Sequence, residues 1–282
     1  MILALDLDDT LLRSDKSVSE RTQAALRRWL AAGHEVVVAT GRPPRFIDAA
    51  LPAELLGAPR VAYNGAHVLI DGSVVYRSEI SPADVRSVVE WTAANRPHWN
   101  IGLEIEDELY LNRASTKPGK YTVADLSTLC DRPAAKVIFY FAGEREDMTA
   151  LVTALPADTR ALITPKFSMV QLCRRTTDKA DALAHLLAAR GLGFDSLVAI
   201  GDDVNDIEMV RQAGIGIAVA NALDEVKAAA DWVTSSADED GVAAAIDRLL
   251  QAPAPIPASA VAADTGNYHV TSERILEPPH PA

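Results

Sequence analysis

The sequence predicts an α/β protein whose core is a doubly wound parallel sheet and which carries a smaller inserted domain. Near both ends of the chain, short apolar segments rich in β-branched residues alternate with amphipathic helical segments. This alternation is typical of the strand–helix–strand units of a parallel sheet. The middle of the chain has the pattern of helices and antiparallel strands instead, so we expect an α+β domain inserted into the first one.

The first 65 residues contain the alternation in its simplest form. Ile2–Leu5 is a short apolar run that ends in aspartates. Apolar residues recur at helical spacing over residues 19–32, and Gly33 follows them. Glu35–Ala39 is largely apolar, as in a strand that is covered on both faces. After a further helical stretch we expect another strand at Arg60–Tyr63.

The same alternation returns late in the chain. We expect helices at residues 178–190, 204–213, 222–230 and 240–250, and strands at 197–200 and 215–219. In the middle we expect helices near 82–95 and 144–155 and antiparallel strands at 101–106, 109–112, 136–141, 160–164 and 169–172. The predicted division is therefore a core of residues 1–80 and 178–250 with an insert of residues 81–177.

The C-terminal end of the chain has a different composition. Six of the sixteen prolines lie from Pro253 onward, and hydrophobic periodicity is weak there. For residues 251–282 we expect a loosely ordered tail.

Composition limits the classes of function. The 282 residues are 49% hydrophobic and 23% charged, with a net charge of −12, which is typical of a globular protein. No run of lysine or arginine suggests nucleic-acid binding, and no apolar run approaches the roughly 18 residues of a membrane helix. The N-terminus lacks the basic flank of a secretory signal. Cys130 and Cys173 are too few for a disulfide framework or a metal knuckle, so we expect a cytoplasmic protein.

Two acidic clusters follow predicted strands, at residues 6–10 (DLDDT) and 201–206 (GDDVND). Taken alone, the first fits a polar turn and the second a capped helix start. A calcium loop is excluded for the first cluster, because Leu11 and Ser17 stand where it needs glycine and an acid. Both clusters are expected at the carboxyl edge of one parallel sheet, where such sheets bind ligands. Converging carboxylates repel each other, and a hard divalent cation, magnesium above all, would relieve that repulsion.

Two further features point to an anion at the same edge. Thr40-Gly41-Arg42 ends a predicted strand, where a hydroxyl and free backbone amides can hold phosphate oxygens, although an ordinary strand-to-helix turn is the alternative. Lys179 stands at a predicted helix start, where the helix dipole disfavours a cation. We interpret this lysine as directed at an anion, with a solvated surface lysine as the alternative.

The chain resembles the haloacid dehalogenase superfamily of phosphohydrolases over about residues 1–250. The resemblance rests on four motifs in chain order: a strand-end DxDxT, a strand-end threonine, a helix-start lysine and a strand-end GDDxxD. The Cof-like branch is the nearest fit, because it inserts its cap domain before the lysine helix. The strings at residues 40–43 (TGRP) and 64–66 (NGA) are also similar to that branch. Ala180 departs from it, since the branch usually has glycine there. The resemblance implies a Rossmann-like core with an inserted α+β cap.

The resemblance also implies a mechanism. Asp6 is then the nucleophile that forms an aspartyl-phosphate, Asp8 the general acid and base, and Thr10 a brace of the loop. The ligands of Mg²⁺ are then Asp6, the backbone carbonyl of Asp8, and Asp202, with Asp206 orienting a metal-bound water or Lys179. The phosphoryl group is then held by Thr40, Gly41, Lys179 and Asn205.

The cap is expected to cover the site and to choose the leaving group. Arg42 and three residues of a basic cap loop, Arg113, Lys117 and Lys120, are possible substrate contacts, and a solvated loop is the alternative for the last three. The predicted partner is a small phosphorylated metabolite, preferably a sugar phosphate. A phosphosugar mutase of the same superfamily, a receiver-like phosphoprotein and a non-catalytic phosphosugar-binding module are the alternatives. The receiver is disfavoured, because its acceptor aspartate lies on a middle strand and it lacks an insert.

Overall fold

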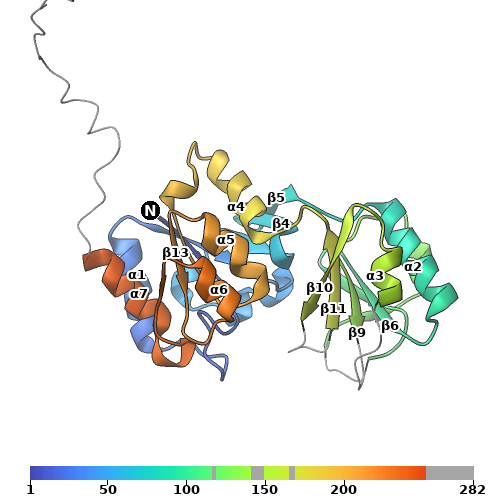
Figure 1. Ribbon diagram of the computed structural model, residues 1–282, viewed down its shortest axis with the longest axis horizontal. Helices are drawn as coiled ribbons and strands as arrows, with labels where there is room; N and C mark the ends of the chain where they lie inside the picture. The colour runs from blue at the N-terminus through green and yellow to red at the C-terminus, as the bar shows by residue number, and fades with distance from the viewer. Residues whose placement is uncertain (116–118, 141–148, 165–168, 252–282) are drawn as a thin grey trace, which may run out of the picture.

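The computed structural model describes residues 1–115, 119–140, 149–164 and 169–251, and it contains two units that each surround one sheet (Figure 1). The larger sheet has the strand order β14-β13-β12-β1-β2-β3-β4-β5. Its strands are β1 (Ile2–Leu5), β2 (Glu35–Ala39), β3 (Arg60–Ala62), β4 (His67–Ile70), β5 (Ser73–Arg77), β12 (Leu197–Gly201), β13 (Ile215–Ala218) and β14 (Trp232–Val233). Its helices are α1 (Glu20–Ala31), α4 (Lys179–Ala188), α5 (Ile207–Gln212), α6 (Asp224–Ala229) and α7 (Gly241–Gln251).

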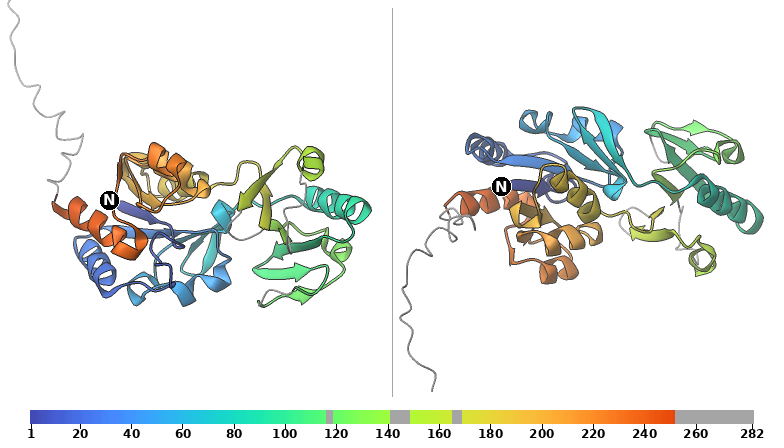
Figure 2. Two further views of the ribbon diagram at one scale, coloured as in Figure 1. Left: turned by 60° about the horizontal axis from the view of Figure 1, so that its bottom comes forward. Right: turned by 90° about the horizontal axis from the view of Figure 1, so that it is seen from above.

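The centre of this larger sheet is parallel and buried. Leu3 of β1 pairs with Val36 on one side and with Val198 on the other. The helices α1 and α7 pack side by side on one face, and α4, α5 and α6 cover the other (Figures 1 and 2). Ser19 caps α1 by accepting a hydrogen bond from the Thr22 amide, as expected for a helix that begins at this point. The predicted α/β class is therefore confirmed.

Two details of the larger unit differ from the prediction. The strands β4 and β5 form an antiparallel hairpin at the sheet edge, which the sequence analysis missed. Its turn, Asp71-Gly72, has two positive φ angles, as a tight hairpin requires. The helical stretch expected after β2 is instead three separate 3₁₀ turns, at Pro44–Phe46, Asp48–Ala50 and Ala53–Leu55. Pro52 lacks the backbone N–H that a continuous helix would need between the last two turns.

The smaller unit, the cap, has the strand order β10-β11-β9-β6-β7-β8. Its elements are α2 (Pro82–Asn95), β6 (Asn100–Ile105), β7 (Glu108–Leu111), β8 (Thr122–Val123), β9 (Lys136–Tyr140), α3 (Thr149–Ala154), β10 (Thr159–Thr164) and β11 (Met169–Arg174). The helices α2 and α3 lie on the side of the sheet away from the larger unit (Figure 1). Alternation along the strands places Leu103, Val137 and Leu172 in the apolar core of the cap. Residues 144–148 of the helix predicted near 144–155, and the predicted tail from residue 252 onward, lie outside the described residues.

The two units are connected by two extended segments (Figure 2). The segments are held together where Ser78 and Thr177 meet, with their hydroxyl oxygens 2.7 Å apart. A second connection is a fork in which Arg45 of the core donates to both carboxylate oxygens of Glu104 in the cap, at 2.8 and 2.9 Å. The Tyr63 hydroxyl donates to the same carboxylate at 3.1 Å. These contacts bring one face of the cap sheet close to the segment that follows β2.

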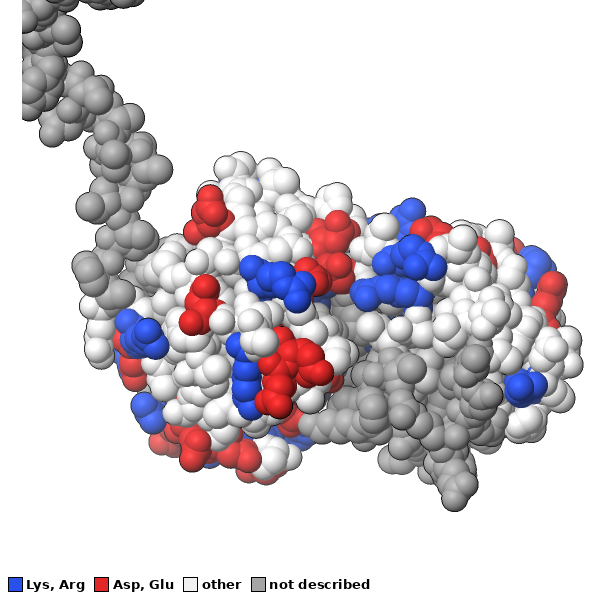
Figure 3. All heavy atoms as spheres, viewed as in Figure 1, with Lys and Arg blue, Asp and Glu red and all other residues white. Residues whose placement is uncertain are grey.

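The distribution of charged side chains on the surface is consistent with the composition. On the face drawn in Figure 3, acidic and basic side chains are intermixed, without an extended basic stretch. In the part of the chain that the structure describes, no helix is both long and apolar enough to cross a membrane. The two cysteines are free and buried.

Candidate active site

The carboxyl ends of three neighbouring strands bring the predicted site residues to one edge of the larger sheet. Asp6 follows β1, Thr40 follows β2, and Asp202 follows β12. The backbone continues the sheet pairing at these positions, since the Asp6 amide donates to Ile200 and the Thr40 amide donates to Val61. The rigid sheet therefore fixes where these side chains begin.

Lys179 connects the two acidic clusters. Its ammonium donates to Asp6 Oδ1 and to Asp206 Oδ1, each at 2.6 Å, and its side chain is fully buried. The alternative of a solvated surface lysine is therefore wrong. Burial by itself would lower the pKa of Lys179, but the two carboxylates outweigh burial and raise it above its ordinary value. The lysine is a permanent cation at the base of the site.

Asp206 and Thr10 hold the acidic loops in place. The second oxygen of Asp206 accepts hydrogen bonds from the amides of Asp202 and Asp203, at 2.9 and 3.1 Å. Thr10 donates from its hydroxyl to Asp202 at 3.0 Å, which ties the first acidic loop to the second. Both oxygens of Asp206 are thus already engaged within the protein.

The carboxylates of Asp6, Asp202 and Asp206 each offer an oxygen within 4.8 Å of the others. Burial raises the pKa of Asp6 well above its ordinary value; Lys179 opposes this shift, and Asp206 and Asp202 add to it. Burial and then Asp206 raise the pKa of Asp202 to about 7. Three carboxylates around one ammonium leave an excess of negative charge. A donor set made only of oxygens, with this excess charge, fits a hard divalent cation.

Asp8 points toward Arg42. The guanidinium makes a two-pronged contact with both oxygens of Asp8, each at 2.7 Å, and Lys16 donates to the same carboxylate at 3.1 Å. Partial burial acts to raise the pKa of Asp8, but the bonds from Arg42 and Lys16 outweigh it, so the pKa lies below its ordinary value. In this structure Arg42, which was predicted as a substrate contact, binds the carboxylate of Asp8.

In the loop after β2, any side chain at position 41 would have to displace Asn64. A Cβ there would lie 2.7 Å from Oδ1 of Asn64. The same Oδ1 accepts a hydrogen bond of 2.8 Å from Nδ2 of Asn205. The Thr40 hydroxyl accepts a hydrogen bond of 3.1 Å from the Arg42 amide. Thr40, Gly41 and Asn205 are therefore neighbours, and Asn64, whose role the sequence analysis left open, lies between the last two.

The cap contributes a cation to this edge, and the sequence analysis missed it. Lys136, at the start of β9, is 4% exposed and donates to the Gly41 carbonyl and to the Gln171 side chain, each at 2.6 Å. Burial lowers its pKa to about 8, against the opposing effect of Glu104. The available signal was a lysine that begins an otherwise apolar strand. In the structure this lysine pairs with Glu104 of β6.

The predicted basic loop of the cap does not occupy this position. Arg113 donates to the carbonyls of Pro97 and His98, near the start of β6, whereas Glu104 near the end of β6 meets the core. Lys120 is exposed, and Lys117 lies outside the described residues. The expectation of an Arg113 contact with substrate is therefore corrected, because its guanidinium binds the far end of the cap.

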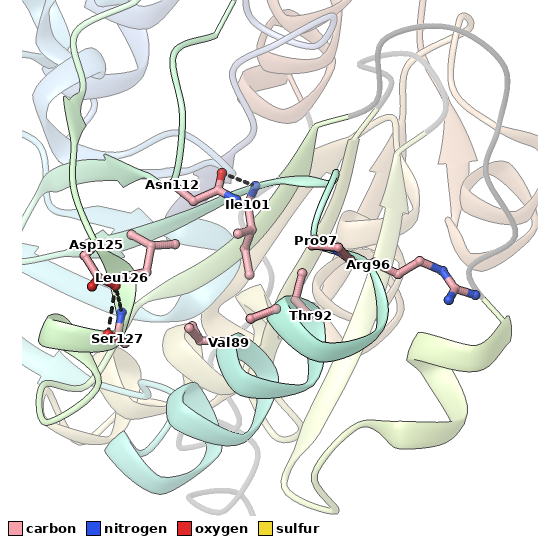
Figure 4. A pocket seen from close by; sticks show the side chains of 10 residues that line it. Val89, Thr92, Arg96, Pro97, Ile101, Asn112, Asp125, Leu126 and Ser127 are labelled. Carbon is pink, nitrogen blue, oxygen red and sulfur yellow. Dashed lines mark hydrogen bonds between the residues drawn. The ribbon is translucent and has the colours of Figure 1, made fainter.

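The cap also contains a cavity of about 210 Å³, between α2 and the residues around Leu126 (Figure 4). Its wall includes Val89, Thr92 and Ile101, and Asn112 lies at its margin. Because it lies on the α2 side of the cap sheet and Lys136 points toward the core, this cavity is separate from the edge described above.

Comparisons with known proteins agree with this geometry. A family model described as haloacid dehalogenase-like hydrolase matches residues 3–246. A 5-amino-6-(5-phospho-D-ribitylamino)uracil phosphatase of Bacillus subtilis is 30% identical over 259 residues, which is 86% of this chain and 94% of that protein. A phosphoglycolate phosphatase of Natronomonas pharaonis is 31% identical over 87% of this chain and 96% of its own. The crystal structure of a haloacid dehalogenase-like hydrolase from Bacteroides thetaiotaomicron superposes with a TM-score of 0.74 at 28% identity, covering 88% of this chain and 98% of that one.

Proposed function

Because this chain belongs to the haloacid dehalogenase-like hydrolases and is a phosphatase, we propose that it hydrolyses a small sugar phosphate, with Mg²⁺, through an aspartyl-phosphate on Asp6. One observation carries the proposal. The Asp6 carboxylate stands at the end of the central strand β1, 2.6 Å from the buried Lys179 ammonium and next to Asp202. A carboxylate, a fixed cation and an oxygen donor set thus lie within one small space, and this supports covalent phosphoryl transfer.

The residues that would hold Mg²⁺ are the carboxylates of Asp6 and Asp202 and the backbone carbonyl of Asp8. Asp206 is left out of this set, because Lys179 and two backbone amides occupy its oxygens. When bound, the cation supplies positive charge that offsets the repulsion between the Asp6 carboxylate and an anionic phosphoryl group.

In the first step, an oxygen of Asp6 forms a bond to phosphorus while the bond from phosphorus to the leaving oxygen breaks. Asp8 donates a proton to that leaving oxygen, so the alcohol departs neutral. The contact with Arg42 keeps Asp8 ionised, so this contact must break before Asp8 can act as an acid. We propose that the entering phosphate takes over the Arg42 guanidinium and so releases Asp8 to take up a proton.

In the second step, water attacks the phosphorus of the aspartyl-phosphate. Asp8, now a carboxylate, accepts a proton from that water, and the bond between Asp6 and phosphorus breaks. Inorganic phosphate leaves and the Asp6 carboxylate is restored. Throughout, Thr40, the Gly41 amide, Lys179 and Asn205 would hold the phosphoryl oxygens.

The division into a catalytic core of residues 1–80 and 178–250 and a substrate-selecting cap of residues 81–177 belongs to the same proposal. The face of the cap sheet that carries Lys136, Gln171 and Glu104 meets the core beside Gly41. Charged and amide side chains suit a leaving group rich in hydroxyls. The Bacillus relative, named for a phosphorylated ribityl compound, supports the same class. A cytoplasmic location is part of the proposal.

The experiment is phosphate release from a panel of sugar, nucleotide and cofactor phosphates, each with Mg²⁺ and after exhaustive chelation. We expect the highest kcat/KM among sugar or sugar-alcohol phosphates, and turnover only with the metal. Equal turnover of all classes would contradict the substrate class. Transfer of the phosphoryl group to a second sugar, with a requirement for a bisphosphorylated sugar, would favour the mutase instead.

A further inference from the structure

The turn that follows β3 has an unusual backbone. Tyr63, Asn64 and Gly65 have φ angles of 55°, 58° and 104°, so three successive residues adopt the left-handed region. Asparagine tolerates this region better than most residues, but a tyrosine there is uncommon. Such a conformation persists only where the surroundings impose it, and it is found most often at functional sites. The contacts of this turn with its neighbours therefore hold it in this conformation.

The turn touches all three segments that carry the proposed phosphate ligands. The amides of Tyr63 and Asn64 donate to the carbonyls of Arg42 and Thr40, at 3.1 Å each. A Cβ on Gly65 would lie 2.0 Å from the Asp178 carbonyl and 3.0 Å from the Lys179 amide, so the turn packs directly against the start of α4. The Asn64 side chain reaches the third segment by its hydrogen bond with Asn205.

The Asn64 side chain is the centre of these contacts. It is 4% exposed, and its Oδ1 lies both against Gly41 and 2.8 Å from Nδ2 of Asn205. The Oδ1 atom of Asn205 is buried and has no hydrogen-bond partner among the described residues. Within that part of the chain, the hydrogen bond that Asn205 donates to Asn64 is thus what fixes the orientation of the Asn205 carboxamide.

We propose that Asn64 is a positioning residue for phosphoryl binding, acting through Asn205. This inference rests on the proposed function. A carboxamide nitrogen carries two hydrogens. Asn64 accepts one of them, and the geometry of the planar amide then directs the second at a fixed angle, where it can donate to a phosphoryl oxygen. Without Asn64, the Asn205 side chain rotates freely, and this donor is lost for part of the time.

The test is a double-mutant cycle read as the inhibition constant of inorganic phosphate, measured beside Tm. Asn64→Gly removes the side chain and keeps a backbone that tolerates φ of 58°. We expect Asn64→Gly and Asn205→Ala each to raise the inhibition constant about tenfold, the effect of losing one hydrogen bond to a charged group. We expect the double variant to raise it by about the same factor, because both changes remove one interaction.

A conservative variant separates positioning from packing. Asn64→Asp keeps an oxygen acceptor for Asn205 and also tolerates the left-handed region. Its negative charge weakens phosphate binding by itself, so the comparison is made within this background. There, adding Asn205→Ala should again cost about tenfold, whereas it should cost nothing in the Asn64→Gly background. As a matched control, Asn112→Ala removes a carboxamide that joins two cap segments and should leave the inhibition constant unchanged.

The outcomes are distinguishable. Multiplication of the two single effects to about a hundredfold would overturn the inference, and so would a lower Tm with an unchanged inhibition constant. A wild-type protein that neither turns over phosphomonoesters nor is stabilised by inorganic phosphate would instead refute the proposed function itself.

Discussion

The Lys179 ammonium lies 2.6 Å from Asp6 Oδ1, and both side chains are buried near the centre of the carboxyl edge of the larger sheet. The pair joins residues 173 positions apart in the sequence. A single ammonium therefore orients the proposed nucleophile and also holds Asp206, which in turn fixes the loop of Asp202. The site and the stability of this edge depend on the same lysine.

Replacing Lys179 with methionine should therefore destabilise the protein as well as inactivate it. The change leaves Asp6 and Asp206 buried without their cation, and removal of one partner from a buried ion pair costs about 3 kcal/mol or more. The free energy of unfolding, from urea titrations without metal, is the measurement. Adding Asp206→Asn to Lys179→Met should recover part of the loss, because one uncompensated charge disappears. If the double variant is no more stable than the single one, charge is not the cause.

Asp6→Asn should lower kcat by at least about a thousandfold, because an amide cannot form the phosphorus–oxygen bond assigned to this residue. Asp9→Asn is the matched control. The Asp9 carboxylate lies 3.4 Å from the ammonium of the exposed Lys16. Its loss should change kcat by less than about tenfold. Equal losses in two equally folded variants would show that Asp6 is not the nucleophile.

Mg²⁺ should raise Tm without any substrate present. Burial, together with repulsion from neighbouring carboxylates, raises the pKa of Asp6 and Asp202, and a bound cation would offset both effects. A ligand that binds only the folded state stabilises it. Thermal unfolding with and without Mg²⁺ measures the effect. The Asp202→Asn variant should lose most of the shift, whereas Asp238→Asn, an acid outside the proposed ligand set, should keep it. An equal shift in both variants would indicate general binding to an acidic protein.

Lys136 should make stability rise with pH above about 8. Its pKa is 10.5 in an unfolded chain and about 8 in the fold. Below pH 8 the lysine is charged in both states; between these values the folded form has lost the proton while the unfolded form still binds it. Unfolding then takes up a proton, so stability rises with pH by up to about 3 kcal/mol. Besides burial, charged neighbours also shift the pKa of Lys136: Glu104 raises it, and Lys179 and Arg45 lower it.

The comparison for this pH effect is Lys136→Met, which cannot titrate. Free energies of unfolding of both proteins are measured from pH 7 to pH 10.5. The difference between the two should shift in favour of the wild type across this range, since all other groups titrate in both. Parallel curves would contradict the lowered pKa.

Much of the core could be predicted from the sequence, because its signals are local. A β-branched run such as Glu35–Ala39 and a capped amphipathic helix such as Glu20–Ala31 are specified by their own residues. The hairpin of β4 and β5 was missed although its Asp71-Gly72 turn is also a local signal. The stretch after β2 was predicted as helical, but it forms separate 3₁₀ turns, because Pro52 lacks the N–H that a continuous helix needs.

The candidate site was predictable only as far as motifs mark it. Asp6, Asp202 and Lys179 stand at strand ends and a helix start, and the order of the elements alone brings them together. Lys136 and Gly41 are 95 positions apart and belong to different units, so their contact depends on how the cap is placed. A basic loop is conspicuous in the sequence, whereas a single buried lysine in a strand is not. This is why Arg113 was expected at the site and Lys136 was not.

Lys136 should govern substrate choice more than chemistry. Its ammonium reaches the Gly41 carbonyl from the cap, while the proposed nucleophile, acid and metal ligands all belong to the core. Lys136→Gln should therefore raise KM for a sugar phosphate by about tenfold, the effect of losing a charged hydrogen bond to the leaving group. The kcat/KM for a small aryl phosphate should change by less than about threefold, because remote binding energy acts only on substrates that make the contact. Arg113→Gln is the matched control, since the Arg113 guanidinium binds the far end of the cap. This variant should leave the kinetic constants for both substrates unchanged. The measurement is steady-state kinetics of the three proteins with both substrates. If Lys136→Gln lowers kcat/KM by one common factor for both, the lysine supports the phosphate loop and does not select the leaving group.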